Sequence, residues 1–224
     1  MSAAPFFQAG GRPQLIGVIG SAADLAYAKR LRPRPDWFEL RLDCFCQMSP
    51  ARLARWRTPL LITARHLAEG GRRTDVSRRN LLLRFLPAAQ AVDVELRSLR
   101  ELKDVWHEAK SLRRICSFHH FQRTPPLGEL RKKLARAEKS GADLFKVVTA
   151  ANTAHALSIL REFLVHAQFP VCVMAVGTFG AESRLLFPKL GSRLIYAPLL
   201  RRQHRGQLTL AQWCARSIIR QPAY

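Results

Sequence analysis

The chain has 224 residues, of which 48% are hydrophobic and 24% charged, so it has ample material for a core and lacks the composition of a disordered protein. Its net charge of +21 comes from 37 lysine and arginine residues against 16 aspartate and glutamate residues, which indicates an anionic partner or substrate. The basic residues are scattered in short pairs instead of one tail, so we interpret most of them as solvated surface and disfavour nucleic-acid binding.

The cysteines and the N-terminal segment indicate where the protein works. The five cysteines are odd in number and several lie in apolar runs, as in a protein of a reducing compartment. Cys44 and Cys46 are too close for the usual zinc spacing and no second pair follows, so we expect no metal site. No stretch reaches membrane-spanning length and Met1–Gly11 lacks a secretory pattern. We therefore expect a cytoplasmic protein that does not enter the membrane.

Short runs of valine, isoleucine, leucine and phenylalanine recur along the chain, each followed by a segment with helical periodicity. This alternation is typical of a parallel sheet. The predicted strands, in chain order, are Leu15–Ser21, Trp37–Asp43, Leu60–Arg65, Ala91–Leu96, Arg114–Phe121, Leu144–Ala150, Val171–Gly177 and Leu194–Leu199.

Helix signals lie between these runs. Ser49 and Pro50 predict the start of the second helix, Asp75 or Ser77 that of the third, and the pair 125–126 that of the fifth. Gly141 is placed to end the fifth helix.

Repeated strand–helix pairs in one domain predict the α/β class, and specifically a (β/α)₈ TIM barrel. We assign residues 14–224 to the barrel as a single domain and residues 1–13 to an N-terminal arm. The alternative is a doubly wound open sheet. No GxGxxG or GxxxxGK loop follows any strand, which disfavours nucleotide binding.

Lys146 lies inside the apolar run 144–148 of the sixth predicted strand. Burial disfavours a charged ammonium and leaves a nucleophilic amine, which can attack a ketone or aldehyde to form a Schiff base. The alternative is a lysine whose stem lines the strand while its head reaches water.

The second predicted strand carries three charges at alternate positions, Glu39, Arg41 and Asp43. Period-two alternation sends them to one face and the intervening leucines to the other. The leucines would pack against helices, so the charges would point into the barrel and need partners there. A self-satisfied ion network and direct ligand contact both remain open for these residues.

Further polar groups follow the ends of other strands, where a barrel builds its active site. The third strand leads to Arg65 and Glu69, and the fifth contains adjacent histidines, of which one should reach the interior. Arg184 follows the seventh strand and is suited to bidentate binding of a carboxylate. The polar loop 201–207 after the eighth strand could act as a lid.

In this order, one motif per strand, the chain resembles type I 3-dehydroquinate dehydratases, the Schiff-base class, from Gly17 to Trp213. The residues that carry the resemblance are Glu39, Arg41 and Asp43; Thr63, Arg65, Glu69, Gly70 and Gly71; Asp93, Glu95 and Leu96; Ser117, Phe118 and His119; Lys146; Gly177, Gly180, Ser183 and Arg184; and Gly206, Gln207 and Leu208.

The resemblance implies a lyase of the shikimate pathway that removes water from 3-dehydroquinate without a metal or organic cofactor. Lys146 would form the Schiff base, His119 would serve as base and acid, and Glu69 would orient the imidazole. Arg184 would bind the substrate carboxylate. The remaining substrate-binding residues would be Glu39, Arg41, Arg65 and Gln207. A homodimer is implied too, and both a biosynthetic and a quinate-degrading role stay open.

The chain departs from the family pattern at several positions. His120 replaces an acidic or amide residue, Ala150 and Ala151 replace Met-Pro, Val176 replaces a methionine, and Gln203 replaces a lid serine. None removes a catalytic group. Three other interpretations are a Schiff-base aldolase of the same barrel type, a basic barrel that binds nucleic acid or another anionic partner, and a barrel with weakened catalysis.

Overall fold

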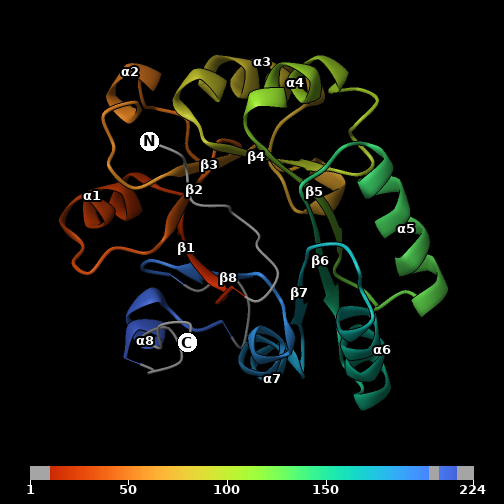
Figure 1. Ribbon diagram of the computed structural model, residues 1–224. Helices are drawn as coiled ribbons and strands as arrows, with labels where there is room; N and C mark the ends of the chain where they lie inside the picture. The colour runs from red at the N-terminus through yellow and green to blue at the C-terminus, as the bar shows by residue number, and fades with distance from the viewer. Residues whose placement is uncertain (1–10, 202–206, 216–224) are drawn as a thin grey trace.

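Five of the strands are buried at every residue, as expected for parallel strands covered on both faces. In the computed structural model, which describes residues 11–201 and 207–215, the strands curve into a barrel with helices outside (Figure 1). The strands are β1 (Gln14–Ile19), β2 (Trp37–Arg41), β3 (Leu60–Thr63), β4 (Ala91–Glu95), β5 (Arg113–His120), β6 (Leu144–Ala150), β7 (Val171–Val176) and β8 (Leu194–Pro198).

All neighbouring strands are parallel and follow chain order from β1 to β7, while β8 pairs with β1. The eight predicted strands are therefore confirmed, and β6 has the predicted bounds; the ends of the others differ by one or two residues. The pairing of β1 with β8 places the last strand beside the first, so the sheet curves into a nearly closed (β/α)₈ barrel and the doubly wound alternative is wrong.

The seam between β7 and β8 is held differently from the other strand pairs. Within the described residues no ladder joins these two strands. The amide of Arg193 donates to the carbonyl of Val171 at 3.0 Å, and the amide of Val173 donates to Ser192 Oγ at 3.0 Å. Isolated backbone and side-chain hydrogen bonds thus complete the barrel at this position.

The helices that surround the strands are of unequal length. They are α1 (Ala22–Arg30), α2 (Pro50–Leu53), η1 (Leu67–Glu69), α3 (Asp75–Phe85), η2 (Leu86–Ala88), α4 (Lys103–Glu108), η3 (Ala109–Ser111), α5 (Leu127–Lys139), α6 (Ala154–Val165), α7 (Gly180–Leu186), η4 (Phe187–Leu190) and α8 (Leu210–Cys214). Within the described part of the chain, none is long and apolar enough to cross a membrane.

The helix signals in the sequence are largely confirmed. Helix α2 begins at Pro50, and α5 begins directly after Pro126. Helix α3 begins at Asp75 with Thr74 as its cap, so Ser77 as its start is wrong. Gly141 follows the end of α5 with φ 78°, a left-handed conformation that favours glycine and stops a helix.

The alternation of side chains along the strands divides the apolar core into two layers. Ile16, Leu61 and Leu144 belong to a cluster inside the barrel, whereas their neighbours Leu15 and Leu60 pack outward against the helices. Interior apolar residues fill the barrel, and charged residues gather where the strands end. This arrangement leaves a polar cavity at the carboxyl ends of the strands.

The domain boundaries predicted from the sequence are only partly covered by the described residues. Residues 1–10, 202–206 and 216–224 lie outside them, so the assignment of 1–13 to an arm and of 14–224 to the barrel domain stays a prediction.

Candidate active site

A cavity of about 620 Å³ opens at the carboxyl ends of the strands. All eight residues predicted for the site line it: Glu39, Arg41, Arg65, Glu69, His119, Lys146, Arg184 and Gln207. They come from six different strands or the segments that follow them, so only closure of the barrel brings them together.

Lys146 is only 4% exposed. The alternative, in which its stem lines the strand while its ammonium group reaches water, is therefore wrong. Its Nζ donates to Asp93 Oδ2 at 2.9 Å and lies 3.5 Å from Glu39 Oε1. The same atom lies 3.8 Å from the centre of the Tyr196 ring. The surroundings of the amine are therefore anionic and aromatic, which differs from the apolar environment that the sequence run indicates.

Asp93 connects Lys146 to a buried arginine. Arg65 Nη2 donates to Asp93 Oδ2 at 2.8 Å, and both residues are nearly inaccessible to solvent. Burial alone would raise the pKa of Asp93, but Arg65 and Lys146 lower it well below its ordinary value. Asp93 is thus a permanent carboxylate that fixes the position of the lysine.

Arg65 lines the cavity, yet most of its guanidinium is engaged by the protein. Nη1 donates to Glu95 Oε1 at 3.0 Å and to Ser117 Oγ at 2.7 Å, in addition to its bonds with Asp93. Arg78, which is fully buried, pairs with the other oxygen of Glu95. Arg65 therefore holds Asp93 in place. Its role in binding substrate stays a prediction from the sequence.

His119 and Glu69 form a second polar pair in the cavity wall. Glu69 Oε2 lies 2.8 Å from His119 Nδ1 and also accepts the backbone amide of His119 at 3.0 Å. When Nδ1 carries the hydrogen, Nε2 keeps its lone pair and is free to act as a base. The prediction that one of the adjacent histidines reaches the interior is confirmed for His119, whose side chain is 7% exposed.

Burial acts on both members of this pair. It raises the pKa of Glu69 to about 7, with a further contribution from the charge of Glu95. It lowers the pKa of His119 well below the ordinary value, and the charges of Arg65 and Lys146 add to this effect. An uncharged imidazole is thus favoured at neutral pH, as a general base requires.

Arg184 projects from α7 into the cavity and is 6% exposed. Within the described residues its guanidinium has no acidic partner; Nη1 lies 3.5 Å from Met174 Sδ, and Nε is buried without an acceptor. Burial lowers the pKa of Arg184 to about 10, which leaves it charged at neutral pH. A buried cation without a counterion is a binding group for an anionic ligand.

The leucines of the second strand point outward and two of its three charges point inward, as predicted. Glu39 and Arg41 line the cavity, whereas Leu40 and Leu42 pack in the outer core. Asp43 is different: it holds Arg41 Nε and Nη2 at 3.0 and 2.9 Å and accepts the amide of Arg65 at 3.1 Å. Its carboxylate fixes the two arginines and does not line the cavity.

Sequence reasoning missed two groups around the amine as site residues. Asp93 alternates with Glu95 in an otherwise apolar strand, so two buried carboxylates were a usable signal for a buried cation nearby. Tyr196 lies in an apolar strand and carried no comparable signal. Its contact with Lys146 depends on how β6 and β8 approach across the barrel.

The residues that depart from the family pattern lie in different places. Gln203 and most of the predicted lid 201–207 lie outside the described residues. Ala150, Ala151 and Val176 are buried, and His120 does not line the cavity. No departure places a different side chain at the amine or the imidazole within the described part of the chain.

The fold and the site define a class: a (β/α)₈-barrel enzyme with a buried, paired lysine, a histidine–carboxylate pair and an arginine free to bind an anion. The family model described as type I 3-dehydroquinase matches residues 20–215, and the chain belongs to this family.

Relatives with known names agree with this assignment. The chain is similar to the 3-dehydroquinate dehydratase of Pyrococcus abyssi, with 35% identity over 79% of this chain and 84% of the relative. It is 28% identical to that of Thermodesulfovibrio yellowstonii over 88% of this chain and 91% of the relative. The solved structure of 3-dehydroquinate dehydratase from Enterococcus faecalis superposes with a TM-score of 0.74 at 26% identity, covering 84% of this chain and 89% of that one.

Proposed function

We propose that the protein removes water from 3-dehydroquinate to give 3-dehydroshikimate through a Schiff base on Lys146. Family membership and the names of the relatives support the substrate. The observation that carries the chemistry is the buried Lys146, held by Asp93 in the same cavity as the His119–Glu69 pair and as Arg184, which has no acidic partner among the described residues.

In the first step the Lys146 ammonium gives one proton to Nε2 of His119, and the resulting amine attacks the C3 ketone. The carbinolamine hydroxyl takes this proton back from His119 and leaves as water, which gives an iminium. The positive charge of the iminium occupies nearly the same position as that of the ammonium. Asp93 and Glu39, at 2.9 and 3.5 Å from Nζ, are already oriented to stabilise it. Fixed carboxylates in a buried site act in this way without reorganisation.

In the second step the iminium acts as an electron sink and acidifies the hydrogens on C2. Nε2 of His119 removes one of them and returns the proton to the C1 hydroxyl, which leaves as water. Glu69, 2.8 Å from Nδ1, holds the ring in the orientation that this transfer needs. Water then hydrolyses the imine, releasing 3-dehydroshikimate and restoring the amine.

Substrate orientation is the role of the remaining residues. Arg184 binds the carboxylate, because it is the buried cation of the cavity that lacks an acidic partner within the described residues. Glu39, Arg41, Arg65 and Gln207 hold hydroxyl groups and narrow the cavity. No metal or organic cofactor is needed for these steps.

Borohydride trapping tests the proposal directly. Reduction in the presence of 3-dehydroquinate should attach the substrate carbon skeleton to the peptide that contains Lys146, as read by mass spectrometry. The K146M variant should show no adduct. The H119A variant should still be trapped, while its turnover falls by about 100-fold or more. Absence of an adduct in the unmodified protein would exclude the Schiff-base mechanism.

The competing activities are distinguished by simple assays. The absorbance of the conjugated enone product reports dehydration and shows whether catalysis is weak, whereas a carbon–carbon cleavage assay would detect an aldolase. Salt-dependent retention on DNA or RNA would indicate nucleic-acid binding. The family match favours dehydration over each of these.

We also propose that the protein is a cytoplasmic homodimer. All five cysteines are free, which agrees with a reducing compartment. The dimer rests on the family resemblance, and sedimentation equilibrium of the purified protein measures it.

A further inference from the structure

A second cavity, of about 560 Å³, lies next to the first and shares Glu69, His119 and Phe121 with it. It is formed outside the barrel wall, where β5 meets α5 and the segment after β4. Phe118 and His120 line only this second cavity, because alternation along β5 turns them to the opposite side of the strand from His119.

Three cationic side chains converge on this cavity: Arg97 follows β4, and Lys133 and Arg136 lie one turn apart on α5. Within residues 11–201 and 207–215, the guanidinium groups of Arg97 and Arg136 make no hydrogen bond or ion pair. Lys133 contacts Glu129 at 3.2 Å and lies 4.4 Å from the centre of the Phe118 ring.

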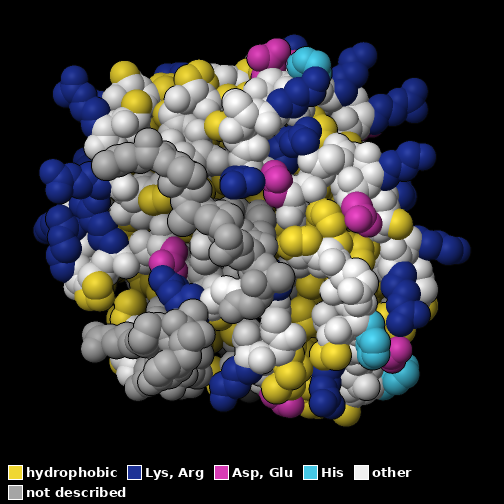
Figure 2. Space-filling model, viewed as in Figure 1, with side chains coloured by type: hydrophobic (Ala, Val, Ile, Leu, Met, Phe, Trp, Pro, Cys, Tyr) yellow, Lys and Arg dark blue, Asp and Glu magenta, His cyan; other side chains and the backbone are white. Residues whose placement is uncertain are grey.

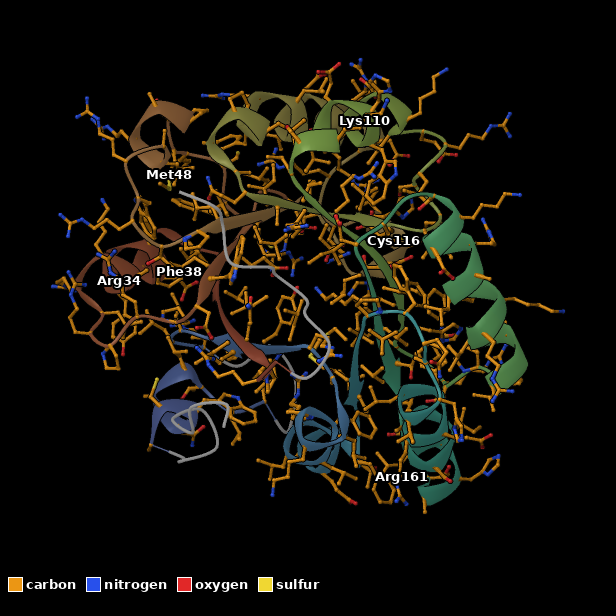
Figure 3. All side chains as sticks on the ribbon, in the orientation of Figure 1. Arg34, Phe38, Met48, Lys110, Cys116 and Arg161 are labelled. Carbon is orange, nitrogen blue, oxygen red and sulfur yellow. The ribbon has the colours of Figure 1, made fainter. Side chains whose placement is uncertain are left out.

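Arg136 is an exposed residue that lines the cavity from the side of α5. Burial raises the pKa of the Cys116 thiol on β5, and the positive charge of Arg136 acts in the opposite direction. Figure 3 shows Cys116 on this part of the barrel wall, beside α5. Glu69 is the only acidic residue lining the second cavity within the described part of the chain, and it is already paired with His119.

The cationic lining is a property of this cavity and not of every cavity in a basic protein. A third cavity of similar size, about 650 Å³, is lined by Asp104 and Glu108 and by no lysine or arginine among the described residues. The net positive charge of the chain therefore does not by itself place cationic side chains in a cavity of this size.

We propose that the second cavity binds a small tetrahedral dianion, a phosphate group, through Arg97, Lys133 and Arg136. Two guanidinium groups and an ammonium offer donors for three oxygens, and the two groups that lack partners lose no internal contact on binding. The free anion and a phosphate monoester share this chemistry. The site is separate from the arginine that binds the substrate carboxylate, since Arg184 does not line it.

Inorganic phosphate is the probe, titrated into the whole protein at constant ionic strength and followed by calorimetry. The K133M/R136M variant should weaken binding by about 10-fold or more, because two charge-assisted contacts are lost. The matched variant K132M/K139M removes the same charge from the same helix at residues that do not line the cavity, and it should change the affinity by less than about 2-fold.

Three outcomes would overturn the proposal: no phosphate binding, equal weakening in both double variants, or loss of binding in R184M, which would place the anion in the first cavity. Binding is measured without turnover, so an inactive protein that binds phosphate would refute the proposed function alone. Parallel titration with glycerol 3-phosphate identifies the source. Tighter binding of the ester assigns the cavity to a phosphorylated metabolite, and tighter binding of inorganic phosphate assigns it to the free anion.

Discussion

Five buried side chains of alternating charge form a row of ion pairs around the amine. Their order is Glu39, Lys146, Asp93, Arg65 and Glu95. Each member is at most 5% exposed, so each would be costly to bury alone. Together the charges compensate one another, and removal of one leaves its partners unpaired. The ion pairs that position the amine therefore also contribute to the stability of the folded chain.

The D93N variant tests this dependence at the level of one residue. Loss of the carboxylate removes the negative charge that compensates the buried Arg65 and Lys146. The free energy of unfolding should therefore fall by about 3–5 kcal/mol. Urea denaturation measures the change, and trapping by borohydride should slow as well. In contrast, E162Q, which removes an ion pair that is half exposed, should cost about 1 kcal/mol or less. Equal losses would show that burial of the network is unimportant.

At the scale of elements, the segment between β3 and α3 is what brings Glu69 to β5. It contains η1 and turns at Gly70, whose φ of 85° favours glycine. Gly71 approaches the chain closely, since a Cβ there would lie 1.7 Å from the carbonyl oxygen of Arg65. A glycine pair therefore fixes the path on which the position of Glu69 depends.

The G71A variant should shift this segment and impair both folding and catalysis. The clash is with backbone, which has little room to move, so we expect a loss of about 1–3 kcal/mol together with lower activity. Gly128 in α5 provides the matched control, because a Cβ added there would meet no atom within 4 Å beyond its own helix backbone and chain neighbours. G128A should raise stability by about 0.5–1 kcal/mol. Urea denaturation and turnover of both variants check the pair.

The contact between η1 and β5 also predicts the pH dependence of the reaction. Burial raises the pKa of Glu69 to about 7 and lowers that of His119, so the carboxylate forms as the pH rises through neutrality while the imidazole is already neutral. The carboxylate accepts from Nδ1 more strongly than the protonated carboxyl group does and makes Nε2 the stronger base, so kcat/KM should rise with pH up to a plateau above about 8. In E69Q, whose amide oxygen accepts at any pH, this limb should disappear at a lower plateau. An unchanged limb in E69Q would assign it to another group.

At the scale of the whole molecule, positive charge surrounds the face drawn in Figure 2, where lysine and arginine side chains far outnumber acidic ones. The cavity itself is lined by Arg41, Arg65, Arg72 and Arg184. A cavity rich in arginine in a protein of net charge +21 attracts a small anion over several ångströms, to an extent that salt screens.

The expected consequence is a kcat/KM for 3-dehydroquinate that falls with ionic strength. Raising the salt from about 0.02 to about 0.5 M should reduce kcat/KM by about 3-fold or more while kcat changes little, because screening acts on encounter and not on the bound complex. Steady-state kinetics in sodium chloride measures both constants. If kcat/KM is independent of salt, the surface charge has no part in substrate capture.

The sequence by itself determined the number and order of the strands and the residues placed at their carboxyl ends. Period-two alternation is a local property of the chain, and the inward direction of Glu39 and Arg41 follows from it. The apolar run 144–148 is local too, and it favours the burial of Lys146. The helix signals at Pro50 and Gly141 are local for the same reason. These predictions needed no knowledge of distant neighbours.

Only the tertiary structure decided which partners those residues meet. Asp93 and Tyr196 reach Lys146 from β4 and β8, and Glu69 reaches His119 across 50 positions of sequence. Such contacts depend on the register and closure of the barrel, which the local pattern leaves free. Hence the sequence indicated a buried amine in apolar surroundings, whereas the folded chain encloses it with two carboxylates and an aromatic ring, because a charge removed from water must be compensated by whatever the barrel brings beside it.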